Sequence, residues 1–262
     1  MASSSTSRLY VADNTNPDSL PPKEDGWTRF VCISDTHSKR YSYIPPGDVL
    51  LHAGDLSSQG FPHRLQKTLD WLGEQPHPVK CIIAGNHDLC LDEDIDATDR
   101  EYFEDKDGIS LQEVREHIRS AEVKSKGIHY LEHEALTITA PSGRRWKVYG
   151  SPAAARYSIG AFQYETKTEA EEIYSRIPAE TEILLTHTPP LRIHDKTRHG
   201  IHAGCPVLAR RLTELQQCRL HVFGHIHESC GASMDEKGRV SVNAALARMH
   251  GRVTVVDLKD ES

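Results

Sequence analysis

The 262-residue sequence lacks an apolar run long enough to cross a membrane, a C-x-x-C pair and an excess of basic residues. The first absence argues against a transmembrane helix, and the second argues against a structural zinc site built on cysteine pairs. Lys and Arg number 31 against 38 Asp and Glu, and a net charge of -7 argues against an extended nucleic-acid-binding surface. A small phosphate-containing substrate remains compatible with this charge, because bound metal ions can dominate the local field.

The first 26 residues are rich in Ser, Asn, Asp and Pro and lack the apolar core of a signal peptide. We therefore expect a cytoplasmic protein whose six cysteines are reduced and mostly buried. Residues 1–26 are predicted to form a polar segment that is flexible at least as far as Leu9. Residues 27–262 are predicted to form one domain.

Short apolar runs and helical patterns alternate along the chain. The runs at 27–34, 48–53 and 79–84 are typical of buried strands, and residues 61–72 between them have helical spacing. This order predicts parallel strands joined by a crossover helix. A charged helical stretch is expected at 92–121. Further helices are expected at 168–177 and 206–217, and strands at 128–131, 135–140, 145–149, 182–186, 220–223, 239–243 and 253–258. The pattern predicts an α/β protein with two sheets packed face to face and helices outside.

Polar clusters follow five of the predicted strands. Asp35 and His37 are two residues apart, so their side chains can point to one face, and Gly54 allows the sharp turn that presents Asp55. In open α/β sheets, ligands bind beyond the carboxyl ends of the strands, so we expect the clusters to meet. The candidate metal ligands are Asp35, His37, Asp55, Asn86, His187, His225 and His227.

This mixture of carboxylate, imidazole and amide groups can hold two divalent ions, and it suits first-row transition metals better than calcium. Two ions about 3.5 to 4 Å apart can clamp both oxygens of an in-line displacement at phosphorus. Each cluster alone has an ordinary explanation: a strand-end turn at Asp35 or Gly54, a cap at Asn86, a core position for His187. Those explanations do not account for five clusters in one order at strand ends.

The order Asp35-x-His37, Gly54-Asp55, Gly85-Asn86-His87-Asp88, His187 and Gly224-His225-x-His227 resembles the calcineurin-like metallophosphoesterase superfamily. The stretches 29–38, 83–87 and 220–228 are similar to the branch that contains the brain metallophosphoesterase-domain proteins, which are related to class III cyclic-nucleotide phosphodiesterases. The resemblance spans roughly residues 29 to 258. It implies a four-layer α/β/β/α sandwich and hydrolysis of phosphodiesters, such as 3',5'- or 2',3'-cyclic AMP and GMP, by a metal-bridging hydroxide.

The resemblance also implies a role for each residue. Asp35, His37 and His227 would hold the first ion, Asn86, His187 and His225 the second, and Asp55 would bridge them. His87 would hydrogen-bond the phosphoryl group and protonate the leaving oxygen, while Asp88 would orient an imidazole. Some members of the branch carry Gly in place of His225, which weakens their second site, whereas this chain keeps the histidine. Arg198 and His199 are candidate substrate-binding residues, because an arginine can grip a phosphate.

The sequence leaves several alternatives open. Manganese is favoured, but iron, zinc, nickel and magnesium suit the same ligands. A phosphodiesterase is favoured over a phosphomonoesterase or protein phosphatase, although the same metals serve both. A catalytically quiet nucleotide-binding scaffold is the third alternative; a lost metal ligand would be its signature, and all seven are present. The sequence does not indicate an oligomeric state.

Overall fold

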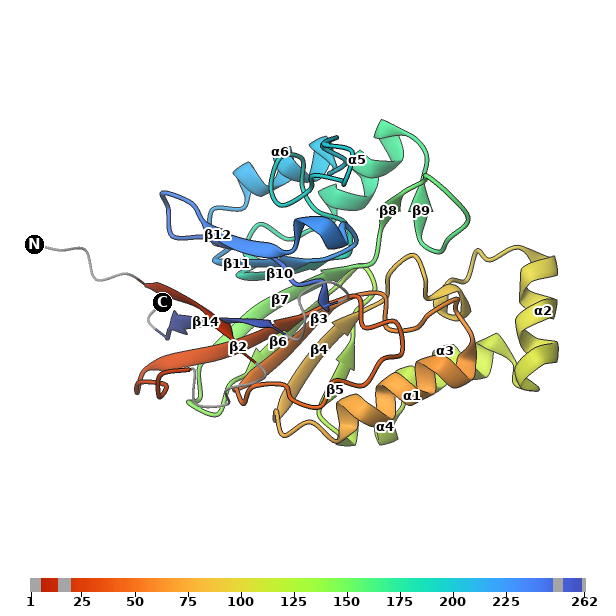
Figure 1. Cartoon of the computed structure of the whole chain (residues 1–262), viewed down its shortest axis with the longest axis horizontal. Helices are drawn as coiled ribbons and strands as arrows, with labels where there is room; N and C mark the ends of the chain where they lie inside the picture. The colour runs from red at the N-terminus through yellow and green to blue at the C-terminus, as the bar shows by residue number, and fades with distance from the viewer. Residues whose placement is uncertain (1–5, 14–19, 247–251, 261–262) are drawn as a thin grey trace, which may run out of the picture.

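The computed structural model describes residues 6–13, 20–246 and 252–260 (Figure 1). In this part of the chain, two six-stranded sheets pack face to face. Helices α1 (Pro62–Gly73), α3 (Leu111–Ile118) and α4 (Ala121–Ser125) cover the outer face of the first sheet, and α5 (Lys167–Ser175) and α6 (Pro206–Glu214) cover the second (Figure 1). The predicted four-layer α/β/β/α sandwich is confirmed.

The first sheet has the strand order β1-β14-β2-β3-β4-β5. Its members are β1 (Ser7–Ala12), β14 (Val253–Lys259), β2 (Trp27–Ile33), β3 (Val49–Ala53), β4 (Val79–Ile83) and β5 (Ile128–Tyr130). Strands β2 to β5 are parallel, and β14 and β1 are added antiparallel at one side. Helix α1 (Pro62–Gly73) makes the predicted crossover between β3 and β4.

The second sheet has the order β12-β13-β11-β10-β7-β6 and repeats this plan. Its members are β12 (Gly231–Met234), β13 (Val240–Asn243), β11 (Leu220–Phe223), β10 (Ile183–Thr186), β7 (Arg145–Ser151) and β6 (Glu134–Thr139). Strands β7, β10, β11 and β13 are parallel, with antiparallel strands at both edges. Helices α5 (Lys167–Ser175) and α6 (Pro206–Glu214) connect its parallel strands, and a short pair, β8 (Ala154–Ala155) and β9 (Gln163–Tyr164), lies outside it.

The apolar runs read as buried strands because both faces of each sheet are covered. In β2, Phe30 and Cys32 pack into the core between the sheets, whereas Val31 and Ile33 pack toward the helices. A third core lies between the second sheet and helices α5 and α6. Five of the six cysteines, Cys32, Cys81, Cys90, Cys205 and Cys218, are buried free thiols, as predicted. No helix in the described ranges is both long enough and apolar enough to span a bilayer.

The predicted helical stretch at 92–121 is helical but not continuous. The stretch forms three helices, α2 (Ala97–Asp107), α3 (Leu111–Ile118) and α4 (Ala121–Ser125). Gly108, with a φ of 64°, ends α2 in the left-handed conformation that glycine favours. Ser110 then begins α3 with a capping box to Glu113. The composition correctly indicates helix, whereas Gly108 and Ser110 mark where one helix stops and the next begins.

The predicted flexibility of the N-terminal segment is wrong for residues 7–9, while residues 1–5 and 14–19 lie outside the described part. Strand β1 pairs with β14 over its whole length, with Leu9 opposite Val256. The Arg8 guanidinium lies 4.1 Å from the ring centre of Trp27 and forms an ion pair with Glu24. This short segment is ordered by a partner more than 240 residues away in sequence, which local composition does not reveal.

Candidate metal centre

The candidate ligands lie beyond the carboxyl ends of parallel strands from both sheets. Asp35 and His37 follow β2, Asp55 follows β3 and Asn86 follows β4 in the first sheet. His187 follows β10, and His225 and His227 follow β11 in the second. The structure brings all seven of these side chains into two adjoining groups, which share Asp55.

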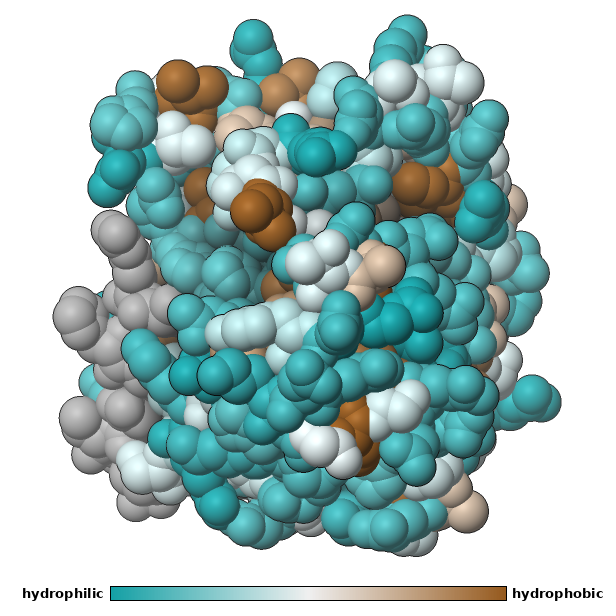
Figure 2. Space-filling model, turned by 90° about the vertical axis from the view of Figure 1, so that its right-hand side faces the viewer, coloured by the Kyte–Doolittle hydropathy of each residue, from teal (hydrophilic) through white to brown (hydrophobic). Residues whose placement is uncertain are grey.

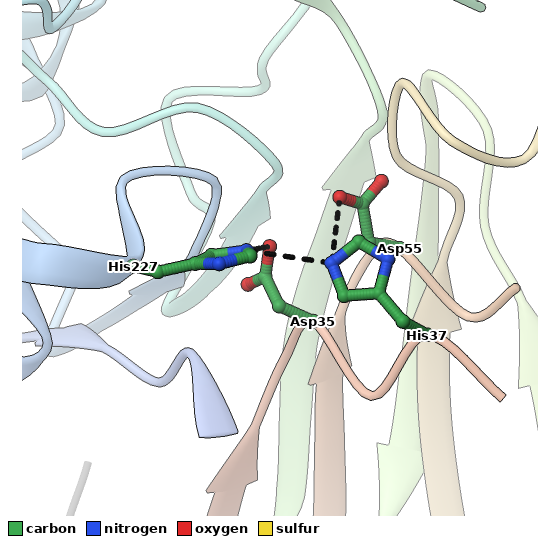
Figure 3. Close-up of side chains that lie close together, drawn as sticks. All are labelled: Asp35, His37, Asp55 and His227. Atoms are coloured by element: carbon green, nitrogen blue, oxygen red, sulfur yellow. Dashed lines mark hydrogen bonds and ion pairs between the residues drawn. The ribbon is translucent and has the colours of Figure 1, made fainter. Parts of the chain in front are cut away.

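The first group contains Asp35, His37, Asp55 and His227 (Figure 3). One ligand atom from each lies within 4.8 Å of all the others. Nε2 of His227 is 3.0 Å from Oδ1 of Asp35, and Nε2 of His37 is 3.6 Å from Oδ2 of Asp55. The two imidazole Nε2 atoms are only 3.4 Å apart. Side chains that direct carboxylate oxygens and imidazole nitrogens at one another in this way form a suitable environment for a cation.

The second group surrounds the side-chain oxygen of Asn86. Nε2 of His187 lies 3.0 Å from Asn86 Oδ1, and Nδ1 of His225 lies 2.8 Å from the same oxygen. His187 Nε2 is also 3.3 Å from Oδ1 of Asp55, so the two Asp55 oxygens face different groups. Nδ1 of His187 lies 2.9 Å from the carbonyl oxygen of Ala53. Donation to that carbonyl leaves the Nε2 lone pair directed into the site.

The backbone at the candidate ligands is strained. Asp35, His37, Asp55 and His225 have φ angles of 54°, 46°, 53° and 67°, in the left-handed region that non-glycine residues rarely adopt. Each such residue costs of order 1 to 3 kcal/mol, and such residues cluster at functional sites. These strained turns direct the candidate ligand side chains toward the site.

Two glycines of the recognised motifs allow the ligands to approach closely. Gly54 has a φ of 99°, and a Cβ atom there would lie 2.5 Å from Nδ1 of His187. A Cβ atom at Gly224 would overlap the Asp35 carboxylate and would lie 2.8 Å from Cβ of Ser34. Contacts this short do not occur in folded proteins, so both positions exclude a side chain.

Burial and mutual charge determine the protonation of the site. Burial opposes ionisation of Asp35, yet the hydrogen bond from His227 and the neighbouring imidazoles hold the pKa of Asp35 well below its usual range. Burial and the charge of Asp35 raise the pKa of Asp55 well above its usual range. Burial lowers the pKa of His37 to about 4 and that of His225 to about 3. The imidazoles of His37 and His225 are therefore neutral near pH 7, which is the form that binds metals.

The donor set fits two divalent transition-metal ions. The first group supplies two carboxylates and two imidazoles, and the second supplies an amide oxygen, two imidazoles and the other oxygen of Asp55. Two buried carboxylates close together repel each other unless a cation compensates their charge. Mixed nitrogen and oxygen donors favour manganese, iron, zinc or nickel over calcium.

His87 lies beside the first group. Its ring centre is 4.8 Å from that of His37 in an edge-to-face arrangement, and its backbone N–H donates to Asp55 Oδ1 at 2.9 Å. The side chain is half-buried. This position suits a residue that reaches a bound substrate, and that role stays a prediction.

The expectation that Asp88 orients an imidazole is wrong. Its buried carboxylate accepts backbone N–H groups of Leu56, Ser57 and Gly85 at 2.7 to 3.0 Å, and the Ser57 hydroxyl at 2.7 Å. These bonds join the turn that carries Asp55 to the turn that carries Asn86. Asp88 therefore holds two ligand-bearing turns together through their backbone.

Arg198 and His199 are exposed, and the hydrogen bonds of their side chains do not reach the candidate ligands. Nε of Arg198 donates to Nε2 of His199 at 3.2 Å, and the Arg198 N–H donates to Glu228, next to His227. Their proposed part in substrate binding stays a prediction.

An aromatic residue outside the predicted substrate-binding residues, Tyr157, contacts a candidate ligand. The ring centre of Tyr157 is 5.4 Å from that of His225, and 67% of Tyr157 is exposed. Figure 2 shows the side of the molecule toward which strands β2 to β4 run in Figure 1, a mainly hydrophilic face with separate hydrophobic spots. The sequence signal for this contact is the presence of two large hydrophobic residues, Tyr157 and Ile159, in one exposed loop.

Comparisons with known proteins agree with this geometry. The model of the calcineurin-like phosphoesterase family matches residues 28–229. The human and mouse proteins named metallophosphoesterase domain-containing protein 1 are each 36% identical over 221 residues, which cover 82% of this chain and 65% of theirs. This chain thus spans slightly less than two thirds of the length of these relatives.

A probable rhamnogalacturonate lyase C from Emericella nidulans is 37% identical over 209 residues, which cover 79% of this chain but 18% of that protein. A crystal structure with 15% identity superposes with a TM-score of 0.55, over 83% of this chain and 90% of the other, which shows a likeness of fold alone. The family model and the human and mouse relatives each match most of this chain. They show that it belongs to the calcineurin-like phosphoesterase family.

Proposed function

We propose that this chain hydrolyses phosphodiesters with two divalent transition-metal ions. The observation that carries the proposal is the convergence of two groups of ligand side chains on Asp55, with one carboxylate oxygen facing each group. Asp35, His37 and His227 would hold one ion, and Asn86, His187 and His225 the other. Such ions, when bound, lower the pKa of water and neutralise charge on the phosphoryl oxygens.

The protein's own contribution is positioning and a proton donor. The strained turns and the glycines at 54 and 224 fix the ligand side chains before a substrate arrives, so little reorganisation is needed during reaction. The half-buried imidazole of His87, beside the first group, would donate to a phosphoryl oxygen and protonate the leaving oxygen. No nucleophilic side chain is required.

Cyclic nucleotides are the proposed substrates. The motifs resemble those of the branch that contains the brain metallophosphoesterase-domain proteins, and the human relative with that domain name is 36% identical. The exposed ring of Tyr157 beside His225 supports the same choice, because an aromatic ring next to the reaction centre can stack on a planar base. Stacking of a base on an aromatic side chain contributes about 1 to 3 kcal/mol.

The test compares turnover of bis(p-nitrophenyl) phosphate and p-nitrophenyl phosphate with Mn²⁺, followed by 3',5'- and 2',3'-cyclic AMP and GMP. We expect faster hydrolysis of the diester, and turnover of at least one cyclic nucleotide. The Asp55→Ala variant measures background activity. Preference for the monoester would replace the proposal with a phosphomonoesterase. Metal uptake and nucleotide binding without turnover of any phosphoester would replace it with a scaffold.

A further inference from the structure

Two buried histidines lie on strands next to ligand-bearing strands, one in each sheet. His52 on β3 and His221 on β11 are fully buried. Their strand neighbours Leu51 and Val222 belong to the core between the sheets, so both histidines point the other way, toward the outer helices. Each strand lies next to one that carries ligands at its carboxyl end, β3 beside β2 and β11 beside β10.

Each histidine makes the same kind of hydrogen bond. His52 Nε2 is 2.9 Å from Thr36 Oγ1, and Thr36 stands between Asp35 and His37. His221 Nε2 is 2.8 Å from Thr186 Oγ1, and Thr186 directly precedes His187.

Each threonine hydroxyl also contacts a backbone carbonyl. Thr186 donates to the carbonyl of Thr188 at 2.8 Å, and Thr36 makes a longer contact of 3.5 Å to the carbonyl of Leu56, which follows Asp55. A hydroxyl has one proton, so a threonine that donates to a carbonyl accepts from the histidine. The 2.8 Å bond from Thr186 to its carbonyl therefore places the proton of His221 on Nε2.

Stability alone does not explain these two histidines. Nδ1 of His52 and of His221 is buried, and neither has a hydrogen-bond partner in the described part of the chain. Burial lowers the pKa of each to about 3, so both are neutral. An unpartnered buried polar atom is destabilising, and an apolar side chain at the same place would avoid that cost.

We infer that His52 and His221 are positioning residues of the metal centre, one in each sheet. The bond from His52 to Thr36 holds the turn that aims Asp35 and His37, and the bond from His221 to Thr186 fixes the turn that aims His187. The inference rests on the proposed metal centre. Hydrogen-bond partners that lie behind metal ligands typically change metal affinity or activity by about 10- to 100-fold when removed.

The experiment titrates Co²⁺ into the metal-free full-length protein and follows its visible absorption, with metal content and thermal unfolding as further readouts. His52→Leu and His221→Leu should weaken Co²⁺ binding by about 10- to 100-fold and change the absorption spectrum. His52→Gln and His221→Gln should restore much of the affinity, because the glutamine N–H can donate to the threonine. Thr36→Val and Thr186→Val, which remove only the hydroxyl, should reproduce the loss.

His77 provides a matched control at the opposite end of the first sheet, just before β4. It is also fully buried, makes one bond of 3.0 Å to the Pro45 carbonyl and leaves Nδ1 without a partner in the described ranges. His77→Leu should lower the unfolding temperature and leave Co²⁺ affinity unchanged.

If folded His52 and His221 variants bind Co²⁺ with the wild-type affinity and spectrum, the inference is overturned. An equal loss of Co²⁺ affinity in His77→Leu would also overturn it. If the leucine variants do not fold, Thr36→Val and Thr186→Val provide the test, and wild-type Co²⁺ affinity and spectrum in both would overturn the inference. Absence of Co²⁺ uptake by the wild-type chain would instead overturn the proposed function, and this inference with it.

Discussion

Replacing Gly224 by alanine tests how closely the Asp35 carboxylate must approach the chain after β11. The new Cβ atom would overlap that carboxylate and lie 2.8 Å from Cβ of Ser34. Asp35 also accepts the His225 N–H with both oxygens at 3.1 Å, so it has little freedom to move. Overpacking of this kind costs about 1 to 3 kcal/mol, and we expect that loss in the metal-free protein.

The displaced carboxylate should also weaken metal binding, by at least about tenfold, since even groups behind a ligand have effects of that size. Urea unfolding measures the first effect, and Co²⁺ titration with hydrolysis of bis(p-nitrophenyl) phosphate measures the second. Gly73→Ala is the control, because its Cβ atom would meet only the flexible side chain of Lys126, with its nearest atom at 2.9 Å. A Gly224→Ala protein with normal affinity and turnover would refute the role of Asp35 as a ligand.

Four further outcomes are expected. Asp55→Ala should abolish hydrolysis and metal uptake, the latter measured by elemental analysis; normal activity would contradict the role of Asp55 as the ligand shared by both ions. His87→Ala should keep its metals but reduce kcat by about 10²- to 10⁴-fold; lost metal would instead make His87 a ligand. Tyr157→Ala should raise KM for cyclic nucleotides about tenfold if its ring stacks on the base, and an unchanged KM would exclude stacking. Burial lowers the pKa of His77 from 6.5 to about 4, so the unfolded chain binds this proton more tightly, and stability falls as pH drops below about 6.5. Between about pH 7 and pH 5, the wild-type free energy of unfolding in urea should therefore fall about 2 kcal/mol more than that of His77→Gln; parallel curves would disprove this.

The sequence predicted the seven candidate ligands because the topology constrains them. Parallel strands place their carboxyl ends at one edge, and a polar cluster directly after an apolar run marks such an end. The glycines at 54 and 224 were recognised as motif residues, but the reason for Gly224 became visible only when Asp35 was seen beside it. The roles of individual ligands stay predictions until metals are measured.

Features that depend on distant or backbone partners were not predictable in this way. Asp88 was assigned to an imidazole because carboxylates often support histidine ligands, whereas it bonds backbone N–H groups of a turn some 30 residues earlier. His221 lies in an apolar run, where a single polar residue alternating with Leu220 and Val222 was the overlooked signal. The position of Tyr157 depends on a loop conformation that no periodicity describes.

Strand β14 lies between β1 and β2, so the first sheet needs a segment from the far end of the described chain. During synthesis on the ribosome, β2 to β5 emerge early, and the edge of β2 stays unpaired until residues 253–259 arrive. An open edge can pair with another molecule, which makes chaperone protection useful during that interval. Translation products that stop before Val253 should aggregate even though every candidate ligand has already been made.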